Sequence, residues 1–302
     1  MGGGFSNGGS APAADYIGKW NGSAWSALGS NGVVEGSFNG TARAIAVSGT
    51  NVYVGGSFTN VSNNGTVLTA ADYIAKWDGS NWSALGSNGA GNSSINGAVQ
   101  AIAISGTDVY VGGAFSDVNN AGTSLTAADY IAKWNGSAWS ALGSNGAGNG
   151  SLSGAVYAIA TSGTDVYVGG NFTDVNNGGT SLTAADYVAK WDGSAWSALG
   201  SNGASGGSLS GAVNAIAISG TDVYVGGNFT DVNNNGTSLT AADYVAKWNG
   251  TNWSALGSNG AGNGSLNGWV YAIAISGTDV YVGGLFTNVN NGGTSLTAAD
   301  CI

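Results

Sequence analysis

The sequence predicts an all-β fold built from repeated four-stranded sheets, and three observations predict it. A unit that begins with Asp-Tyr-Ile, or a close variant, returns every 57 residues. Each unit contains short β-branched runs separated by glycine turns, without the apolar spacing of a capped helix. Aromatic residues, among them 11 Trp and 12 Tyr, recur at fixed intervals and supply a core for a chain with 56 Gly.

The repeats are nearly identical to one another. Residues 129–185 and 186–242 differ at only seven positions, so each unit needs nearly the same environment as the next. We therefore expect one domain over residues 1–302, with overlapping copies of a connecting loop at 1–14 and 287–302. The five repeats are 15–71, 72–128, 129–185, 186–242 and 243–299.

Each repeat contains two hairpins. Residues 99–104 and 108–111 flank the tight turn Ser105-Gly106-Thr107, and residues 130–134 and 138–142 flank Asn135-Gly136, a dipeptide preferred in primed two-residue turns. Four antiparallel strands in a unit of this length are typical of one blade of a β-propeller. The sequence thus predicts a five-bladed β-propeller with four antiparallel strands per blade.

The repeat also resembles a known family. The pair Gly112-Gly113 after the second strand, followed by Tyr130 and Trp134 on the third, is similar to the kelch repeat. This resemblance implies that the strand over 101–104 lines a central channel and that the strand over 139–142 lies outermost. The near-identity of the blades also resembles that of a recently amplified or designed symmetric propeller.

The two ends of the chain complement each other. Residues 15–29 supply a third and a fourth strand, and residues 269–286 supply a first and a second. We expect a 2+2 strand clasp in which these halves join as the fifth blade and leave no open sheet edge. Residues 300–302 repeat residues 15–17, so the two segments compete for one strand position. We expect residues 15–17 to occupy it and the C-terminal copy to fray.

Charge and cysteine content argue against several partners. The net charge of −10, with only six basic residues, provides no patch that neutralises phosphates, so we expect no nucleic acid partner. There is no apolar run long enough for a membrane span, and Met1–Phe5 lacks the charged and apolar regions of a signal peptide. Cys301 is the single cysteine, so neither an intramolecular disulfide nor a cysteine metal cluster is expected.

Catalysis is not expected either. The chain has no histidine, and its one cysteine is the penultimate residue, so the usual general base and activated nucleophiles are missing. We predict no enzyme activity and no cofactor. The repeated aspartates at strand starts and in the first hairpin turn are interpreted as turn-capping residues.

Repeated charge pairs lie on one side of the third strand. We interpret them as structural salt bridges, with anion binding along the ring as the alternative. The pairs are Asp15–Lys19, Asp72–Lys76, Asp129–Lys133, Asp186–Lys190 and Asp243–Lys247.

One loop matches half of a calcium-binding pattern. Asp231, Asn233 and Asn235 precede Gly236 with the spacing of an EF-hand loop, but the twelfth position is Ala242 and not an acidic residue. We favour an Asx-rich turn without metal, and a calcium site is the weaker alternative.

Positions where the repeats disagree are the candidate ligand site. One position carries several side-chain types just where the long loop enters the innermost strand, and Trp269 lies two residues before its last member. A second variable set follows the Gly-Gly pair at 57, 114, 171, 228 and 285. We expect both sets at one rim of the channel, where aromatics and amides favour glycan or peptide binding, with neutral drift as the other interpretation. The first set is Arg43, Gln100, Tyr157, Asn214 and Tyr271.

Two functions follow from these features. The first is a non-catalytic symmetric scaffold without a defined ligand, and the alternative is a lectin-like or adhesive binding module that uses the rim. Abundant Ser, Thr, Asn and Gly with few charges resemble bacterial surface repeats, which favours an extracellular or cell-surface location. We expect a monomer, with a strand-exchanged dimer as the alternative.

Overall fold

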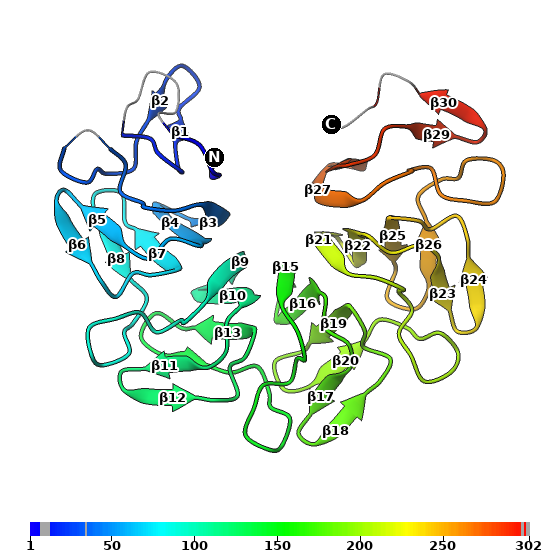
Figure 1. Ribbon diagram of the computed structural model, residues 1–302. Helices are drawn as coiled ribbons and strands as arrows, with labels where there is room; N and C mark the ends of the chain where they lie inside the picture. Colours follow the sequence, from blue (N-terminus) through cyan, green and yellow to red (C-terminus); the bar gives the residue numbers. More distant parts are fainter. Residues whose placement is uncertain (7–12, 34, 297–298, 300–302) are drawn as a thin grey trace. The chain divides into compact units, whose positions relative to one another are not determined.

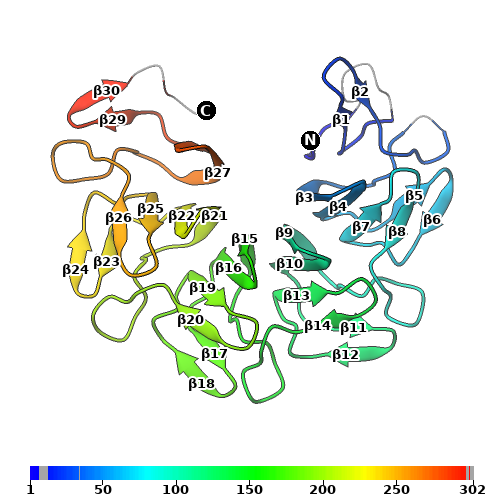
Figure 2. The same ribbon diagram turned by 180° about the vertical axis from the view of Figure 1, so that it is seen from behind.

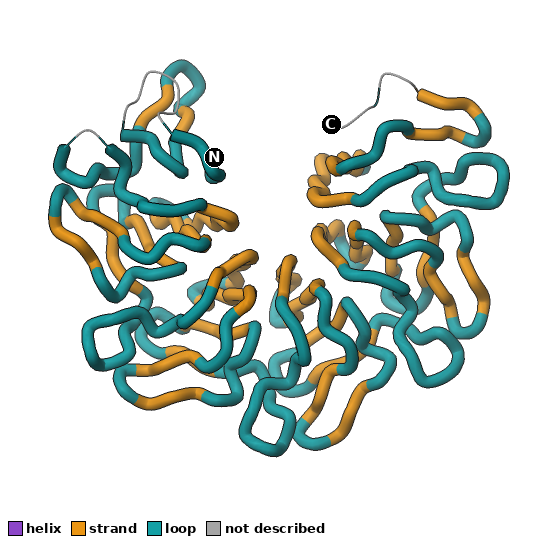
Figure 3. The backbone as a smooth tube through the Cα atoms, in the orientation of Figure 1, coloured by secondary structure: helices purple, strands orange, loops and turns teal. Residues whose placement is uncertain are grey.

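The computed structural model describes residues 1–6, 13–33, 35–296 and 299, and all regular structure in this part of the chain is β (Figure 3). The chain divides into two compact units, residues 1–142 with 148–150, and residues 143–147 with 151–302. Within the described residues there is no helix that is long and apolar enough to cross a membrane.

The first unit contains two four-stranded antiparallel sheets and the half sheet β1–β2, besides small hairpins described below (Figure 1). Within each large sheet the strands are ordered as they occur in the chain. The sheets consist of β3 (Ala42–Ser48), β4 (Asn51–Gly56), β7 (Ile74–Trp77) and β8 (Trp82–Ala84), then β9 (Ala98–Ser105), β10 (Asp108–Ala114), β13 (Ile131–Trp134) and β14 (Trp139–Ser140), and the pair β1 (Lys19–Trp20) and β2 (Trp25–Ser26).

The second unit contains the same kinds of sheet (Figure 2). Its sheets consist of β15 (Val156–Ser162), β16 (Asp165–Gly170), β19 (Val188–Trp191) and β20 (Trp196–Ala198), then β21 (Val213–Ser219), β22 (Asp222–Gly227), β25 (Val245–Trp248) and β26 (Trp253–Ala255), and the pair β27 (Val270–Ser276) and β28 (Asp279–Gly284). The predicted four-stranded unit and its strand order are therefore confirmed in both units.

A further small hairpin follows each of the strands β4, β10, β16, β22 and β28, where we predicted only an Asx-rich turn. In one repeat, Asn119 Oδ1 accepts a hydrogen bond from Gly122 N at 2.7 Å, and Ala121 and Gly122 both have positive φ, which closes a tight turn. The hairpins are β5 (Val61–Asn63) with β6 (Thr66–Leu68), β11 (Val118–Asn120) with β12 (Thr123–Leu125), β17 (Val175–Asn177) with β18 (Thr180–Leu182), β23 (Val232–Asn234) with β24 (Thr237–Leu239), and β29 (Val289–Asn291) with β30 (Thr294–Leu296).

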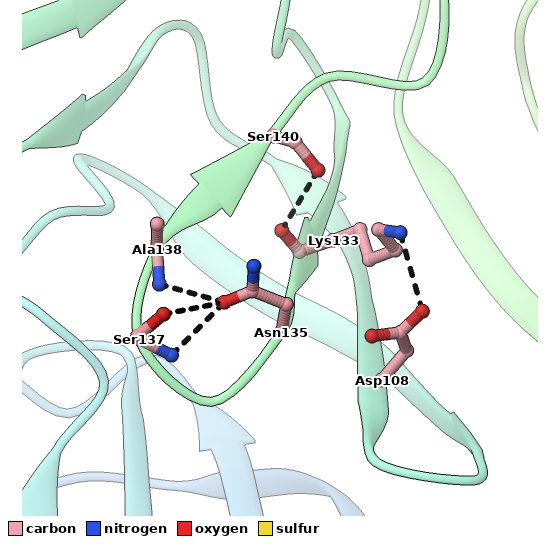
Figure 4. A network of polar contacts seen from close by, with 6 residues as sticks. All are labelled: Asp108, Lys133, Asn135, Ser137, Ala138 and Ser140. Carbon is pink, nitrogen blue, oxygen red and sulfur yellow. Dashed lines mark hydrogen bonds and ion pairs between the residues drawn. The ribbon is translucent and has the colours of Figure 1, made fainter.

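The two predicted turns have different outcomes. Ser105 pairs with Asp108 and Gly106 has a φ of 60°, so the first hairpin has the expected tight glycine turn, with Gly106 and Thr107 as its two loop residues. The primed turn expected at Asn135-Gly136 is wrong, because Trp134 pairs with Trp139 across a four-residue loop. Asn135 Oδ1 instead accepts hydrogen bonds from the backbone N–H groups of Ser137 and Ala138, at 3.0 and 2.9 Å (Figure 4).

Neighbouring repeats within a unit are joined by buried tryptophans. The Nε1–H of Trp139 donates to Leu85 O of the preceding repeat at 2.8 Å, and that of Trp253 donates to Leu199 O at 2.7 Å. Each of these indole rings is 3% exposed, so the bond is made in an apolar site where a lost partner is costly. The core thus lies between consecutive sheets and depends on the next repeat.

Candidate functional site

The variable residue predicted as a ligand contact is the extra residue of a β-bulge. The pairing of β9 with β10 skips Gln100, because Val99 pairs with Gly113 and Ala101 pairs with Gly112. The same shift occurs at the other four copies, Arg43, Tyr157, Asn214 and Tyr271. A bulge residue leaves the ladder and its side chain is aimed differently from its neighbours, so this position is freed from sheet packing.

The Gly-Gly pair makes this bulge possible. A Cβ on Gly227 would lie 2.0 Å from the carbonyl oxygen of Ala212, just before the bulge, so only glycine fits there. A Cβ on Gly226 would lie 2.4 Å from Val270 Cγ1 of the next repeat. The first glycine therefore permits close packing of neighbouring sheets, and the second permits the bulge.

The bulge residues of the second unit differ in what they contact. The Nδ2 of Asn214 donates to the carbonyl oxygen of Val270 in the next sheet at 3.2 Å, so this side chain links two repeats. The rings of Trp269 and Tyr271 meet edge-on with centroids 6.3 Å apart, and they are 45% and 46% exposed. Tyr157 is half-buried. Of the predicted set, the structure therefore brings together Asn214, Trp269 and Tyr271.

The first unit carries two members of the predicted site. Arg43 is exposed and Gln100 is half-buried. The second variable set borders the first within each sheet, since Ser57 N donates to Thr41 O at 3.0 Å and Ala114 pairs with Ala98. The two variable sets are thus adjacent in each repeat, and their place at the rim of a channel stays a prediction.

Aspartates at the start of the third strand hold the loops together. The carboxylate of Asp129 accepts the N–H of Asp117 at 2.9 Å and the N–H of Gly150 at 3.1 Å. Asp117 has a φ of 54°, an unfavourable conformation that this hydrogen bond stabilises. The same two bonds recur at Asp186 and Asp243, so the capping interpretation of these residues is confirmed.

Asp72 is the exception among these carboxylates. Ser93 stands where other repeats have glycine, and its hydroxyl donates to the carbonyl oxygen of Asp72 at 2.9 Å. Asp72 Oδ1 is buried without a hydrogen-bond partner, and burial raises the pKa of this carboxyl above its usual value. Two differences therefore accompany the missing cap: Ser93 replaces the glycine, and the N–H of Asn60 donates to Asn39 Oδ1 at 3.2 Å and not to Asp72.

The partners predicted for Lys133, Lys190 and Lys247 are wrong, although all three lysines do form salt bridges. Lys133 Nζ lies 3.2 Å from the carboxylate of Asp108, across the sheet in the first hairpin turn, and not beside Asp129 (Figure 4). Lys190 pairs with Asp165 at 3.2 Å and Lys247 with Asp222 at 3.1 Å. The reason is that the strand-start aspartates turn toward backbone N–H groups, which leaves the lysines to the turn aspartates.

The half-match to a calcium loop has a local explanation. Asn233 Oδ1 accepts the N–H of Gly236 at 2.7 Å, and Asn235 Oδ1 accepts the hydroxyl of Ser201 at 2.9 Å. Asp231 donates its backbone N–H to Asp243 at 2.9 Å. The side chains of Asn233 and Asn235 therefore serve different contacts, and the described residues contain no group of three His, Cys, Asp or Glu placed to hold a metal.

Polar pockets between consecutive loops are a feature that sequence reasoning missed. One pocket of about 520 Å³ lies between Asp186, Asn202, Ser210 and the small hairpin that contains Asn233. An equivalent pocket of about 400 Å³ lies one repeat later, around Asp243 and Asn259. An equivalent of about 470 Å³ lies in the first unit beside Asp15. Their hydroxyls and amides suit hydrogen bonding to polyols, but no nucleophile with an adjacent base lines them. The pockets form between residues more than 30 positions apart, which no local pattern indicates.

Comparison with known proteins identifies no family. No family model matches the chain, and no curated protein matches it. Among solved structures, the chain is similar to the computationally designed Ika4 protein, with 16% identity over 62% of this chain and 86% of that chain and a TM-score of 0.34. It is also similar to the computationally designed Ika8 protein, with 16% identity over 86% of this chain and 88% of that chain and a TM-score of 0.31.

Proposed function

We propose that the chain is a non-catalytic repeat scaffold, a five-bladed β-propeller in which β27–β28 and β1–β2 join as the fifth four-stranded sheet. The observation that carries this proposal is that the recurrent polar groups serve the structure itself. Asp129 caps two loop N–H groups, Lys133 pairs with Asp108, and Trp139 bonds the carbonyl of Leu85. A chemistry that needs an available acid, base or nucleophile has none among these repeated residues.

Joining of the half sheets follows from sequence identity. Residues 279–284 repeat residues 222–227 without change, and β22 pairs in register with β25 through Val223–Trp248 and Tyr224–Lys247. The equivalent partners in the N-terminal half sheet are Trp20 and Lys19. Pairing of β28 with β1 would satisfy the backbone groups of both strands.

Molar mass measured by light scattering under reducing conditions tests the scaffold. We expect a single species near 29.4 kDa. A species of twice that mass would indicate that two chains exchange their half sheets, and larger polydisperse species would contradict a self-closing scaffold.

A second candidate function is ligand binding at the bulge positions, and the exposed pair Trp269 and Tyr271 favours it. Paired aromatic faces with a nearby amide are suited to stacking on a sugar or a peptide side chain. A glycan or peptide array probed with the parent chain and with Tyr271→Ala tests this candidate, with Tyr157→Ala and Asn214→Ala as further variants. Binding that survives all three substitutions would exclude the bulge positions, and Val33→Ala, at an exposed loop residue, is the matched control.

A further inference from the structure

The N-terminal five residues occupy the place that a second strand takes in every complete sheet. Gly3 N donates to Tyr16 O at 3.0 Å, and Tyr16 N donates to Phe5 O at 2.9 Å. In the next repeat, Gly56 N donates to Tyr73 O at 2.9 Å, and Tyr73 N donates to Phe58 O at 2.9 Å. The segment Met1–Phe5 is thus the structural counterpart of residues 54–58.

The match extends along the strand and into the packing. Gly2 forms a bridge with Ile17, as Gly55 does with Ile74 in its sheet. Met1 and Gly18 exchange both backbone hydrogen bonds, at 2.9 and 3.0 Å. A Cβ on Gly2 would lie 3.0 Å from Ile45 Cδ1 of the next sheet, and a Cβ on Gly55 would lie 2.3 Å from Val99 Cγ1 of its next sheet.

These contacts also stabilise a strained residue. Tyr16 has a φ of 63°, as its counterparts do, and the bond from Ile17 N to Asp15 O at 2.8 Å makes it the centre of a three-residue turn. The backbone groups of Tyr16 need a neighbouring strand on this edge. Residues 1–5 supply it.

The chain contains a second segment with the same pattern. Residues 282–286, Val-Gly-Gly-Leu-Phe, continue β28 and correspond to residues 54–58, Val-Gly-Gly-Ser-Phe. In the described part of the chain, β28 pairs with β27 alone, and Tyr281 is 58% exposed. The proposed fifth sheet places residues 282–286 against Tyr16–Gly18, where residues 1–5 already lie.

We propose that residues 1–5 and residues 282–286 are alternative occupants of the backbone edge at Tyr16–Gly18, directly before β1, so that the N-terminal segment limits closure of the fifth sheet. This inference rests on the proposed joining of the half sheets. The incoming segment is the C-terminal strand of the same chain, because it repeats the side-chain pattern that this edge accepts in each complete sheet. Release of Met1–Phe5 exposes the donors and acceptors that β28 needs.

Disulfide trapping tests the competition. Tyr281→Cys and Lys19→Cys occupy positions equivalent to Tyr224 and Lys247, which face each other in a complete sheet, and Cys301→Ser removes the native thiol. This pair lies beyond the residues that Met1–Phe5 covers, so the N-terminal segment does not block the bond sterically. The rate of intramolecular disulfide formation therefore reports the population with β28 beside β1.

Two changes remove the N-terminal occupant. Gly3→Pro deletes the N–H that bonds Tyr16 O, and a chain that starts with Met followed by Ser6 removes the segment. We expect the disulfide to form about fivefold faster with Gly3→Pro, the value of one backbone hydrogen bond, and faster still in the shortened chain. Gly4→Ala is the matched control, because its Cβ meets only Thr41 atoms at 3.6 Å or more.

The outcomes separate the two proposals. Equal rates in the parent, Gly3→Pro and shortened chains would overturn the competition and leave the joined fifth sheet standing. Absence of an intramolecular disulfide in all three would overturn both. A disulfide that links two chains would show that a second copy supplies the strand, which contradicts closure within one chain.

Discussion

Two segments of identical sequence, β22 and β28, differ in burial. Both read Asp-Val-Tyr-Val-Gly-Gly, yet Val223 and Val225 are buried whereas their equivalents Val280 and Val282 are only half-buried. Likewise Tyr224 is half-buried, whereas Tyr281 is 58% exposed. β22 lies between β21 and β25 and packs on the next repeat, while β28 pairs only with β27 among the residues that the structure describes. The difference shows that each repeat is stabilised by its neighbours more than by its own residues.

The largest test of this dependence is removal of an inter-repeat tryptophan. Trp253→Ala deletes a ring that is 3% exposed and its bond to Leu199 O, so we expect a loss of about 3–5 kcal/mol in the free energy of unfolding. Its counterpart Trp25 is half-buried, and Trp25→Ala should cost about 1–2 kcal/mol. Urea unfolding of both variants measures the gap. In the Gly3→Pro background, joining of the half sheets should bury Trp25 further and bring the two losses of unfolding free energy closer together. Equal losses for Trp253→Ala and Trp25→Ala in the parent chain would contradict stabilisation of each repeat by its neighbours.

Contacts inside one hairpin should not depend on neighbours. A Cβ on Gly227 would lie 2.0 Å from Ala212 O, and one on Gly284 would lie 1.9 Å from Trp269 O. Both Gly227→Ala and Gly284→Ala should therefore cost a similar amount, about 1–3 kcal/mol, although one strand is buried and the other exposed. Thermal unfolding of the pair checks this, and a neutral Gly284→Ala would show that β27–β28 is not formed.

The missing cap at Asp72 gives a pH-dependent test. Ser93→Gly introduces the glycine found at the equivalent position 150, whose N–H donates to Asp129. We expect the same bond to form to Asp72 and to add about 0.5–1.5 kcal/mol to the free energy of unfolding at pH 7. The pKa of Asp72 is raised by burial, so its unfavourable contribution is fully present above the folded pKa and disappears as pH falls below the unfolded value. The gain from Ser93→Gly should accordingly shrink in acid. If the added stability of Ser93→Gly does not change with pH, it comes from the loop backbone and not from the Asp72 carboxylate.

The smallest expected effect concerns the cross-strand ion pairs. Lys133 and Asp108 are each about one-third exposed, so a double-mutant cycle with Lys133→Met and Asp108→Asn should give about 0.2–1 kcal/mol. In the sheet that contains Lys76, Asn51 stands at the position equivalent to Asp108, so Lys76 has no aspartate at that position. Lys76→Met is therefore the control for the loss of the lysine side chain itself. A coupling energy well above this range would mean that the pair is less hydrated than its exposure indicates.

Much of the fold was predictable because it depends on local patterns. The hairpin at Ser105-Gly106-Thr107 follows from strand-forming residues and turn residues, which act over a few positions, whereas the strand order was implied by the resemblance to the kelch repeat. The small hairpin at Val118–Leu125 was missed because its short strands are rich in Asn, Thr and Ser, and it is closed by Asn119 and stabilised by the bridge from Ile95 to Val118.

The candidate site was less predictable. Sequence variation located the bulge positions but not the bulge itself, which follows from the approach of Gly227 to Ala212 O. The lysine partners were assigned by spacing along one strand, whereas Asp129 is directed away by the N–H groups of Asp117 and Gly150. Contacts between residues 12 and 21 positions apart decided that outcome. The predicted fraying of residues 300–302 falls outside the described residues.

Amide hydrogen exchange at Val280 and Val223 tests the joined fifth sheet most directly. Both amides have the same sequence neighbours, so their intrinsic exchange rates match, and Val223 pairs with Trp248 as Val280 would pair with Trp20. In the Gly3→Pro chain, we expect protection of Val280 to lie within about tenfold of that of Val223. Exchange of Val280 at the rate of an unstructured peptide, beside a protected Val223, would contradict the closed scaffold.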